Sequence, residues 1–141
     1  MRKYRGKTKD GKWVEGYYMK RLQGETVENG EIVKCYADQI LPEDSYFAAE
    51  VIPASVGQSI DVRDKNKKEV YFDDIVLWNG KKWVVVWNKT MLGVYLQPLD
   101  NYIAHKNDPK KGRLIENLMY KRAVYLEVIG NTTDDPELLE G

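Results

Sequence analysis

The single cysteine and the single histidine are the residue types best suited to nucleophilic catalysis. Cys35 lies in the apolar stretch EIVKCY, and His105 lies seventy positions later in a polar segment. A thiolate–imidazole pair needs the two side chains within hydrogen-bond reach, and this spacing does not predict such a contact. One cysteine and one histidine also fall short of the four ligands of a structural zinc site. The sequence therefore predicts neither a catalytic thiol nor a zinc centre.

Paired carboxylates are the next candidates, for general acid–base chemistry. Asp73-Asp74 and Asp134-Asp135 are adjacent pairs, but neighbours in a strand point to opposite faces. We expect Asp73-Asp74 to bond nearby backbone amides and Asp134-Asp135 to cap a helix. A third acidic group lacks the spacing and the central glycine of a calcium loop; it comprises Asp61, Asp64, Asn66 and Glu69. We expect no catalytic, cofactor or metal site, and a protein that is not an enzyme.

Aromatic and basic residues gather in IVLWNGKKWVVVWN, residues 75–88, which holds three of the four tryptophans. Asn79-Gly80 favours a two-residue hairpin turn, because both central residues must take positive φ. This turn sets the strand register. The predicted pairs are Trp78 with Lys81, Leu77 with Lys82, Val76 with Trp83, and Ile75 with Val84.

Both faces of this hairpin are mostly apolar, which predicts a central position covered on both sides. We expect the tryptophan face to be core, since large rings gain most from burial. The opposite face would cost several kcal/mol if left in water, so residues 1–50 or another subunit should cover it. The tryptophan face carries Val76, Trp78, Lys81, Trp83, Val85 and Trp87, and the opposite face carries Ile75, Leu77, Lys82, Val84 and Val86.

A nucleic-acid-binding role is the alternative to a core role for this hairpin. Aromatic rings can stack on bases while lysines contact phosphates, and a second basic cluster falls in the predicted mobile loop 101–113. Against this role, 22 basic residues balance 22 acidic ones, and the basic start of the chain is offset by its acidic close. The candidate nucleic-acid contacts are Lys81, Lys82, His105, Lys106, Lys110, Lys111 and Arg113.

Composition narrows the class of protein further. At 141 residues the chain has the size of one domain, with possible sub-lobes at 1–50 and 51–141. Its longest apolar stretch, residues 83–87, is far shorter than a membrane span. The basic N-terminal segment lacks the apolar stretch of a secretion signal, so we expect none. A single cysteine fits a reducing cytoplasm. We therefore expect a cytoplasmic protein with no membrane partner.

Apolar alternation and dense turn residues predict an all-β fold with short helical additions. Asp10-Gly11 is typical of a tight turn between two strands. Residues 114–120 could form two helical turns, and Asp135-Pro136 is typical of a helix start. The other predicted strands are Glu31–Tyr36, Tyr46–Ile52, Gln58–Arg63, Leu92–Gln97 and Ala123–Ile129.

Three separated motifs resemble the YopX family of small proteins encoded by bacteriophages and prophages. They are MRKYRGKTKDGKWVEG at residues 1–16, IPASVGQSIDVRDKNKKEVYFDDIV at 52–76, and EVIGNTTDDPELL at 127–139. Two positions depart from the family pattern, because Lys67 and Asp73 stand where glycine is usual. We expect Asn66 to supply the left-handed residue of the first turn.

The resemblance implies an SH3-like β-barrel, here elaborated by an N-terminal hairpin region and a short C-terminal helical turn. It also implies a phage or prophage protein of the bacterial cytoplasm, with no known activity and no residue roles to carry over. Two functions stay open. One is a non-catalytic module that binds an unknown protein or a second copy of itself, and the other is a nucleic-acid-binding barrel.

Overall fold

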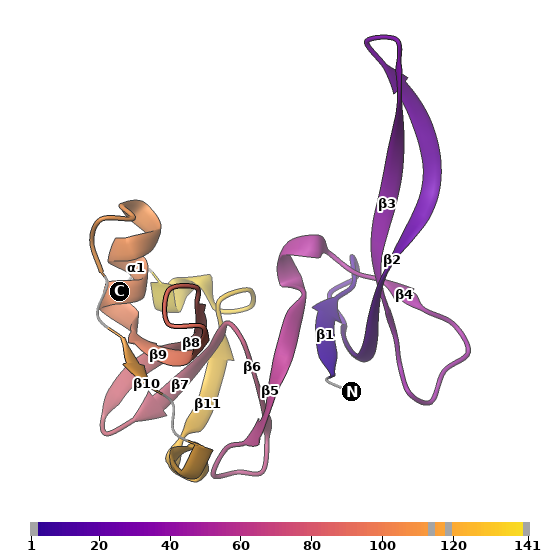
Figure 1. The fold of residues 1–141 in the computed structure, drawn as a ribbon. Coiled ribbons are helices and arrows are strands. Elements are labelled where there is room, and N and C mark those ends of the chain that lie inside the picture. Colours follow the sequence, from indigo (N-terminus) through magenta and orange to yellow (C-terminus); the bar gives the residue numbers. More distant parts are fainter. Residues whose placement is uncertain (1–2, 113–114, 118–119, 140–141) are drawn as a thin grey trace. The chain divides into compact units, whose positions relative to one another are not determined.

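The computed structural model describes residues 3–112, 115–117 and 120–139 (Figure 1). The chain divides into two compact units, residues 1–58 and 59–141. Each unit has its own antiparallel strands, and the two are described separately below.

The first unit is a sheet in the order β4-β3-β2-β1, with the start of β5 added beside β1. Its small core lies where these strands meet, around Ile40 and Val51, which are buried. Gly6 on β1 allows this packing, because a Cβ there would lie 2.9 Å from Val51 Cβ. The elements are β1 (Tyr4–Lys7), β2 (Trp13–Glu28), β3 (Glu31–Leu41), β4 (Ala49–Glu50), the 3-10 turn η1 (Pro53–Ser55) and β5 (Gly57–Arg63).

β2 and β3 are far longer than their neighbours, with 16 and 11 residues against four in β1 and two in β4. Asn29 and Gly30 join them, both with positive φ (50° and 81°). The closing pair is Glu28 opposite Glu31, so this is a two-residue hairpin turn. Figure 1 shows the two strands projecting beyond the rest of their unit. Part of β3 was predicted from the sequence, but this Asn-Gly turn was not.

The second unit is built on a five-stranded sheet in the order β10-β9-β8-β7-β11. The end of β5 pairs with β6 beside it. Its strands are β6 (Glu69–Tyr71), β7 (Asp74–Trp78), β8 (Lys81–Asn88), β9 (Gly93–Pro98), β10 (Glu116–Asn117) and β11 (Glu127–Asn131). Its helical elements are α1 (Leu99–Asn107) and the 3-10 turns η2 (Tyr120–Tyr125) and η3 (Pro136–Leu139).

The β7–β8 hairpin confirms the predicted turn and register. Asn79 and Gly80 have φ values of 51° and 73°, and all four predicted pairs form. Trp83 is 5% exposed and belongs to the main core cluster. Its Nε1–H donates to the carbonyl of Trp78, whose ring lies 5.6 Å away. These two indoles are therefore core, whereas Trp87 is 51% exposed.

Helix α1 covers the opposite face of this hairpin, and the prediction of a mobile loop over residues 101–113 is wrong for residues 101–107, which are helical. α1 contacts both β8 and β9. Gln97, which pairs with Val84 on that face, donates from its side-chain amide to the carbonyl of Gly112. Ile75 and Val84 are fully buried. The expectation that either residues 1–50 or another subunit must cover this face is therefore wrong, because α1 contacts it.

Several other predicted boundaries are corrected. Only Ala49–Glu50 of the expected strand 46–52 pairs, and the expected strand 123–129 is divided between η2 and β11. The Asp10-Gly11 turn spans five residues, since Lys7 pairs with Trp13. The helix expected over 114–120 falls partly outside the described residues, and 116–117 form β10.

The all-β class is confirmed, with α1 as the one α-helix of the described residues. No strand pairing among those residues closes either sheet into a cylinder, so an SH3-like barrel stays a prediction. None of the described helices has the length and apolar character to cross a bilayer.

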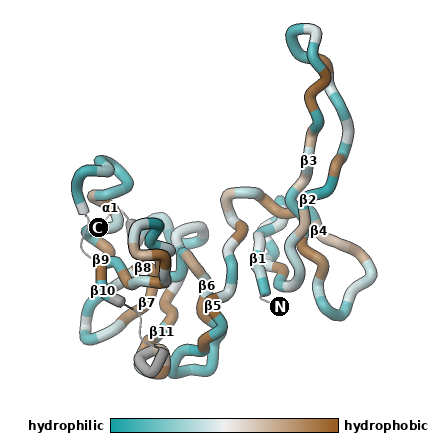
Figure 2. The backbone as a smooth tube through the Cα atoms, viewed as in Figure 1, coloured by the Kyte–Doolittle hydropathy of each residue, from teal (hydrophilic) through white to brown (hydrophobic). Residues whose placement is uncertain are grey.

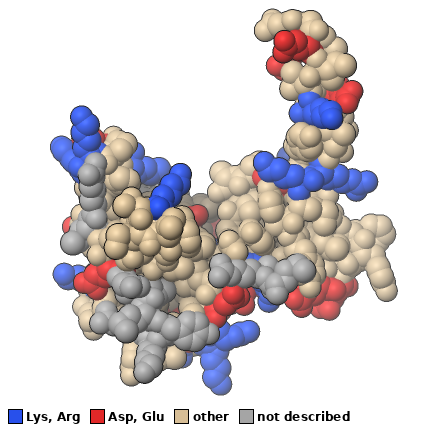
Figure 3. Space-filling model, in the orientation of Figure 1, with Lys and Arg blue, Asp and Glu red and all other residues tan. Residues whose placement is uncertain are grey.

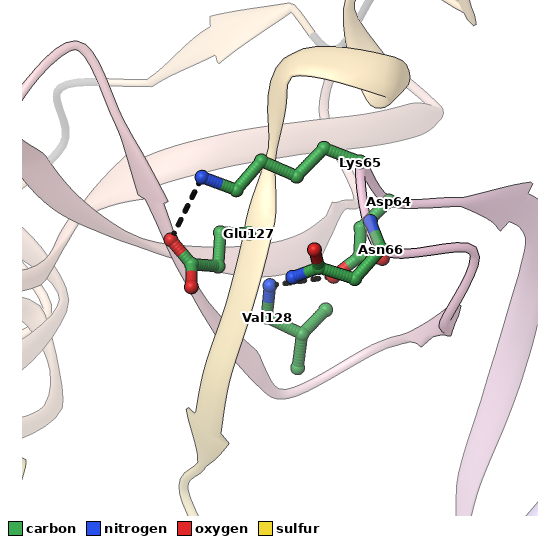
Figure 4. Close-up of polar contacts among 5 residues, drawn as sticks. All are labelled: Asp64, Lys65, Asn66, Glu127 and Val128. Atoms are coloured by element: carbon green, nitrogen blue, oxygen red, sulfur yellow. Dashed lines mark hydrogen bonds and ion pairs between the residues drawn. The ribbon is translucent and has the colours of Figure 1, made fainter.

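Two of the motifs, 52–76 and 127–139, meet at one buried carboxylate. Asp64 is 4% exposed. Its Oδ1 accepts the backbone N–H groups of Asn66 and Lys68, and its Oδ2 accepts that of Val128 (Figure 4). An exposed ion pair between Lys65 and Glu127 lies beside it at 3.0 Å.

The two positions that depart from the family's glycines both adopt left-handed backbone. Lys67 has φ 63° and Asp73 has φ 72°. The prediction that Asn66 takes the left-handed conformation is therefore wrong: Lys67 does so itself. Asp74 does bond a nearby amide as expected, by accepting the N–H of Tyr71. Asp135 accepts the N–H of Asn131, so its carboxylate stabilises the turn before η3.

Candidate functional site

The projecting part of the β2–β3 hairpin is the most exposed segment of the described chain. We call residues 20–36 the arm. Every residue from 20 to 34 is exposed, and neither outer strand edge is paired over that stretch in the described structure. A two-stranded ribbon is marginally stable in water on its own. The arm is therefore a candidate binding element, because contact with a partner would stabilise it.

One face of the arm carries two cross-strand pairs of apolar side chains, with the Glu25–Lys34 pair between them. Leu22 lies opposite Tyr36, and Val27 lies opposite Ile32. A bulge at Gln23 inserts one extra residue between these pairs, which rotates Leu22 onto the same face as Val27. The four apolar side chains are 47–73% exposed. Figure 2 shows hydrophobic positions along the arm that no other part of the unit covers. Apolar side chains that gather on one exposed face mark interaction sites.

The charges of the arm are sorted along its length. Lys20 and Arg21 lie near its base, whereas Glu28 and Glu31 form the closing pair at its tip. Figure 3 shows the acidic residues near the tip and the basic ones closer to the base. Like charges directly opposite each other destabilise a sheet. The tip therefore carries an unfavourable pair that an approaching cation would relieve.

A groove in the second unit is the other candidate. Its volume is about 750 Å³, and it lies between the end of β8 and the segment that contains α1. The Nδ1 atom of His105 lies 3.0 Å from the carbonyl oxygen of Lys111, which ties the end of the helix to the following turn. The lining residues are Val86, Trp87, Asn88, Lys89, Thr90, Gln97, Tyr102, His105, Lys106, Pro109, Gly112 and Ile115.

Tyr102, which lines the groove, is partly buried. Burial raises the pKa of its phenol, and the nearby carboxylate of Asp73 raises it further, while a hydrogen bond with Thr132 acts in the opposite direction. The phenol is therefore neutral at physiological pH. A neutral phenol in a groove can donate a hydrogen bond to an anionic or carbonyl oxygen.

The structure divides the predicted nucleic-acid contacts into two groups. His105 and Lys106 line the groove, and Lys110 and Lys111 are exposed on the turn that follows. Lys81 and Lys82 are exposed at the other end of β8, about 20 Å from its last residue at ~3.3 Å per residue. Arg113 lies outside the described residues. The predicted set therefore does not form one continuous basic site.

Cys35 and His105 have separate local partners. The Cys35 sulfur lies 4.0 Å from the hydroxyl of Thr26 across the arm, and the His105 ring is engaged with Lys111. Neither arrangement supplies a base for the thiol. The arm is a candidate element that the sequence did not predict. Its signal was Asn29-Gly30 followed by the strand-forming stretch EIVKCY.

Comparison with known proteins gives one match. A protein-family model described as "YopX protein" matches residues 3–140, nearly the whole chain. The match covers the projecting hairpin as well as the three motifs. No curated protein matches the sequence.

Proposed function

The chain belongs to the YopX protein family, and for this member we propose a non-catalytic binding module that associates with another protein chain through the arm. The proposal includes the origin that the sequence resemblance implies, a bacteriophage or prophage, and action in the cytoplasm of the bacterial host. It also includes an SH3-like barrel in the second unit of the chain.

The observation that carries this proposal is the unbroken exposure of residues 20–34. Fixing a residue's backbone costs about 1–2 kcal/mol of conformational entropy, and buried apolar surface normally offsets that cost. No side chain between residues 20 and 34 is buried, although one face of the arm carries Leu22, Val27, Ile32 and Tyr36. A partner that covers this face would supply the missing burial.

The chemistry of the arm favours a protein partner over a polyanion. Its three cations are matched by three glutamates, so it presents no net positive charge to a phosphate backbone. Its open strand edges offer unpaired backbone groups for strand addition, a common mode of peptide recognition. The charged residues are Lys20, Arg21, Glu25, Glu28, Glu31 and Lys34.

Nucleic-acid binding in the groove is the second candidate. It is supported by one arrangement, in which Tyr102, His105 and Lys106 line a groove next to Lys110 and Lys111. Aromatic rings beside cations suit single-stranded nucleic acid, because bases stack and phosphates pair with lysines. The balanced net charge of the chain gives this candidate less support than the arm has.

In-cell photocrosslinking tests the proposed function. A photoreactive residue at Val27, which is 73% exposed on the arm, should give discrete covalent adducts in the bacterial host, identified by mass spectrometry. The matched control is the same residue at Met91, which is 60% exposed in the second unit. Adducts from Val27 alone support the arm as the binding element. Adducts from Met91 alone, or no adduct from Val27, contradict it.

A further inference from the structure

We infer that the partner of the arm is the arm of a second copy of this chain, bound antiparallel so that the tip of each lies beside the base of the other. This inference rests on the proposed function and names its partner. It follows from the order of charges along the arm, from the Glu28–Glu31 pair at its tip and from the position of its apolar residues.

The charges select this orientation. Two arms aligned tip to tip would bring four glutamates together, since each tip has Glu28 opposite Glu31. Arg21 and Glu28 lie on the face opposite the apolar side chains, whereas Lys20 faces Asp38 of its own chain. When two arms lie side by side along their β2 edges, tip to base, Glu28 of each arm meets Arg21 of the other. Arg21 is available for this role because its own cross-strand neighbour is Ala37. Opposite charges across an interface favour one register and suppress the alternatives.

The apolar residues fit the same arrangement. Val27 and Ile32 lie towards the tip, whereas Leu22 and Tyr36 lie towards the base. In the same edge-to-edge arrangement Val27 of one arm lies beside Leu22 of the other, and two-fold symmetry makes both contacts equivalent. Glu25 and Lys34 face each other within each arm, between the two apolar pairs. Each arm is thus complementary to a copy of itself in both its charged and its apolar contacts.

Charge reversal with mixing tests the inference. The base variant carries Arg21→Glu, and the tip variant carries Glu28→Lys and Glu31→Lys. All three positions are exposed, and Arg21 lies opposite Ala37, so melting temperatures should stay close to that of the parent chain. Association of the full-length protein is measured by sedimentation equilibrium at low and high salt. The matched control carries Lys9→Glu and Lys12→Glu in the β1–β2 turn, also exposed and outside the arm.

The parent and the control should form dimers that weaken with salt. Each variant alone should associate at least tenfold more weakly, because residue 28 of one copy then meets a residue 21 of the same charge in the other. An equimolar mixture of the two variants should recover the dimer as a heterodimer, since every tip again meets a base of opposite charge. A mixture as weakly associated as its components would overturn the inference, as would a parent chain that stays monomeric. If the parent is monomeric and a photoreactive residue at Val27 crosslinks to a different protein, the inference about a second copy is overturned. The proposed function, binding to another protein chain through the arm, then still holds.

Discussion

The carboxylate of Asp64 accepts the backbone N–H of Val128 at 2.9 Å, although 64 residues separate them. The other oxygen of the same carboxylate caps the turn that follows β5 by accepting the N–H groups of Asn66 and Lys68. One buried side chain thus fixes a turn and docks β11 beside it. This contact joins two of the motifs through which the chain resembles its family.

Replacing Asp64 should unfold the second unit more easily. Asp64→Ala leaves the N–H of Val128 without its acceptor in a part-buried position, which should lower the free energy of unfolding by about 2–4 kcal/mol. Lys65→Ala is the control, because it removes only the exposed ion pair with Glu127, worth at most about 1 kcal/mol. Urea titrations of both variants compare the losses. Equal losses would show that the carboxylate has no special role.

The two classes of tryptophan should respond differently to truncation. Trp83→Ala removes a ring that is 5% exposed in the core and should cost about 3–5 kcal/mol. Trp87→Ala removes a half-exposed ring whose edge-to-face contact is with Phe72, and should cost about 1 kcal/mol. Thermal unfolding measures both. A Trp83→Ala protein with an unchanged melting temperature would contradict a core role.

Restoring a glycine at Lys67 should stabilise the chain. Lys67 holds φ 63° with an exposed side chain, a conformation that glycine adopts without steric cost. We expect Lys67→Gly to raise the free energy of unfolding by about 0.5–1 kcal/mol. Lys68→Gly, the neighbouring control without positive φ, should lower it instead, because glycine gains more freedom in the unfolded chain. Destabilisation by Lys67→Gly would show that the lysine side chain contributes more than its backbone conformation costs.

The nucleic-acid candidate makes a prediction of its own for heparin chromatography. A groove that binds phosphates should lose retention in a variant carrying Lys106→Glu, Lys110→Glu and Lys111→Glu, which should elute at lower salt. The variant with Lys81→Glu and Lys82→Glu should elute like the parent, because those lysines lie at the other end of β8. Unchanged elution of the groove variant would exclude this candidate.

Local turn chemistry explains which parts of the fold were predictable. Asn79-Gly80 fixes both the conformation of its turn and the register of β7 with β8, so the core tryptophans followed from the sequence. Asn29-Gly30 carries the same signal, but the polar residues before it hid the length of β2. A strand that buries nothing shows weak alternation, because no core selects its inward side chains.

The helix was missed for a different reason. Residues 99–107 have a weak apolar pattern, and none of them is fully buried. The contacts with β8 and β9 stabilise the helix more than its own sequence does. The groove could not be predicted either, since its walls come from segments that only the packing of α1 brings together. Tertiary contacts thus determine the conformation of residues 99–107 and the shape of the groove, which the local sequence does not specify.

Hydrogen–deuterium exchange tests the central claim, that the arm is the surface through which the chain associates. In dilute protein the amides of residues 20–34 should exchange rapidly, because no packing protects them, while those of Val84 and Val85 in β8 should exchange slowly at any concentration. Raising the protein concentration into the range of association should slow exchange at least tenfold within residues 20–34. Association with unchanged exchange in the arm, or with new protection confined to the groove residues 86–112, would contradict the account.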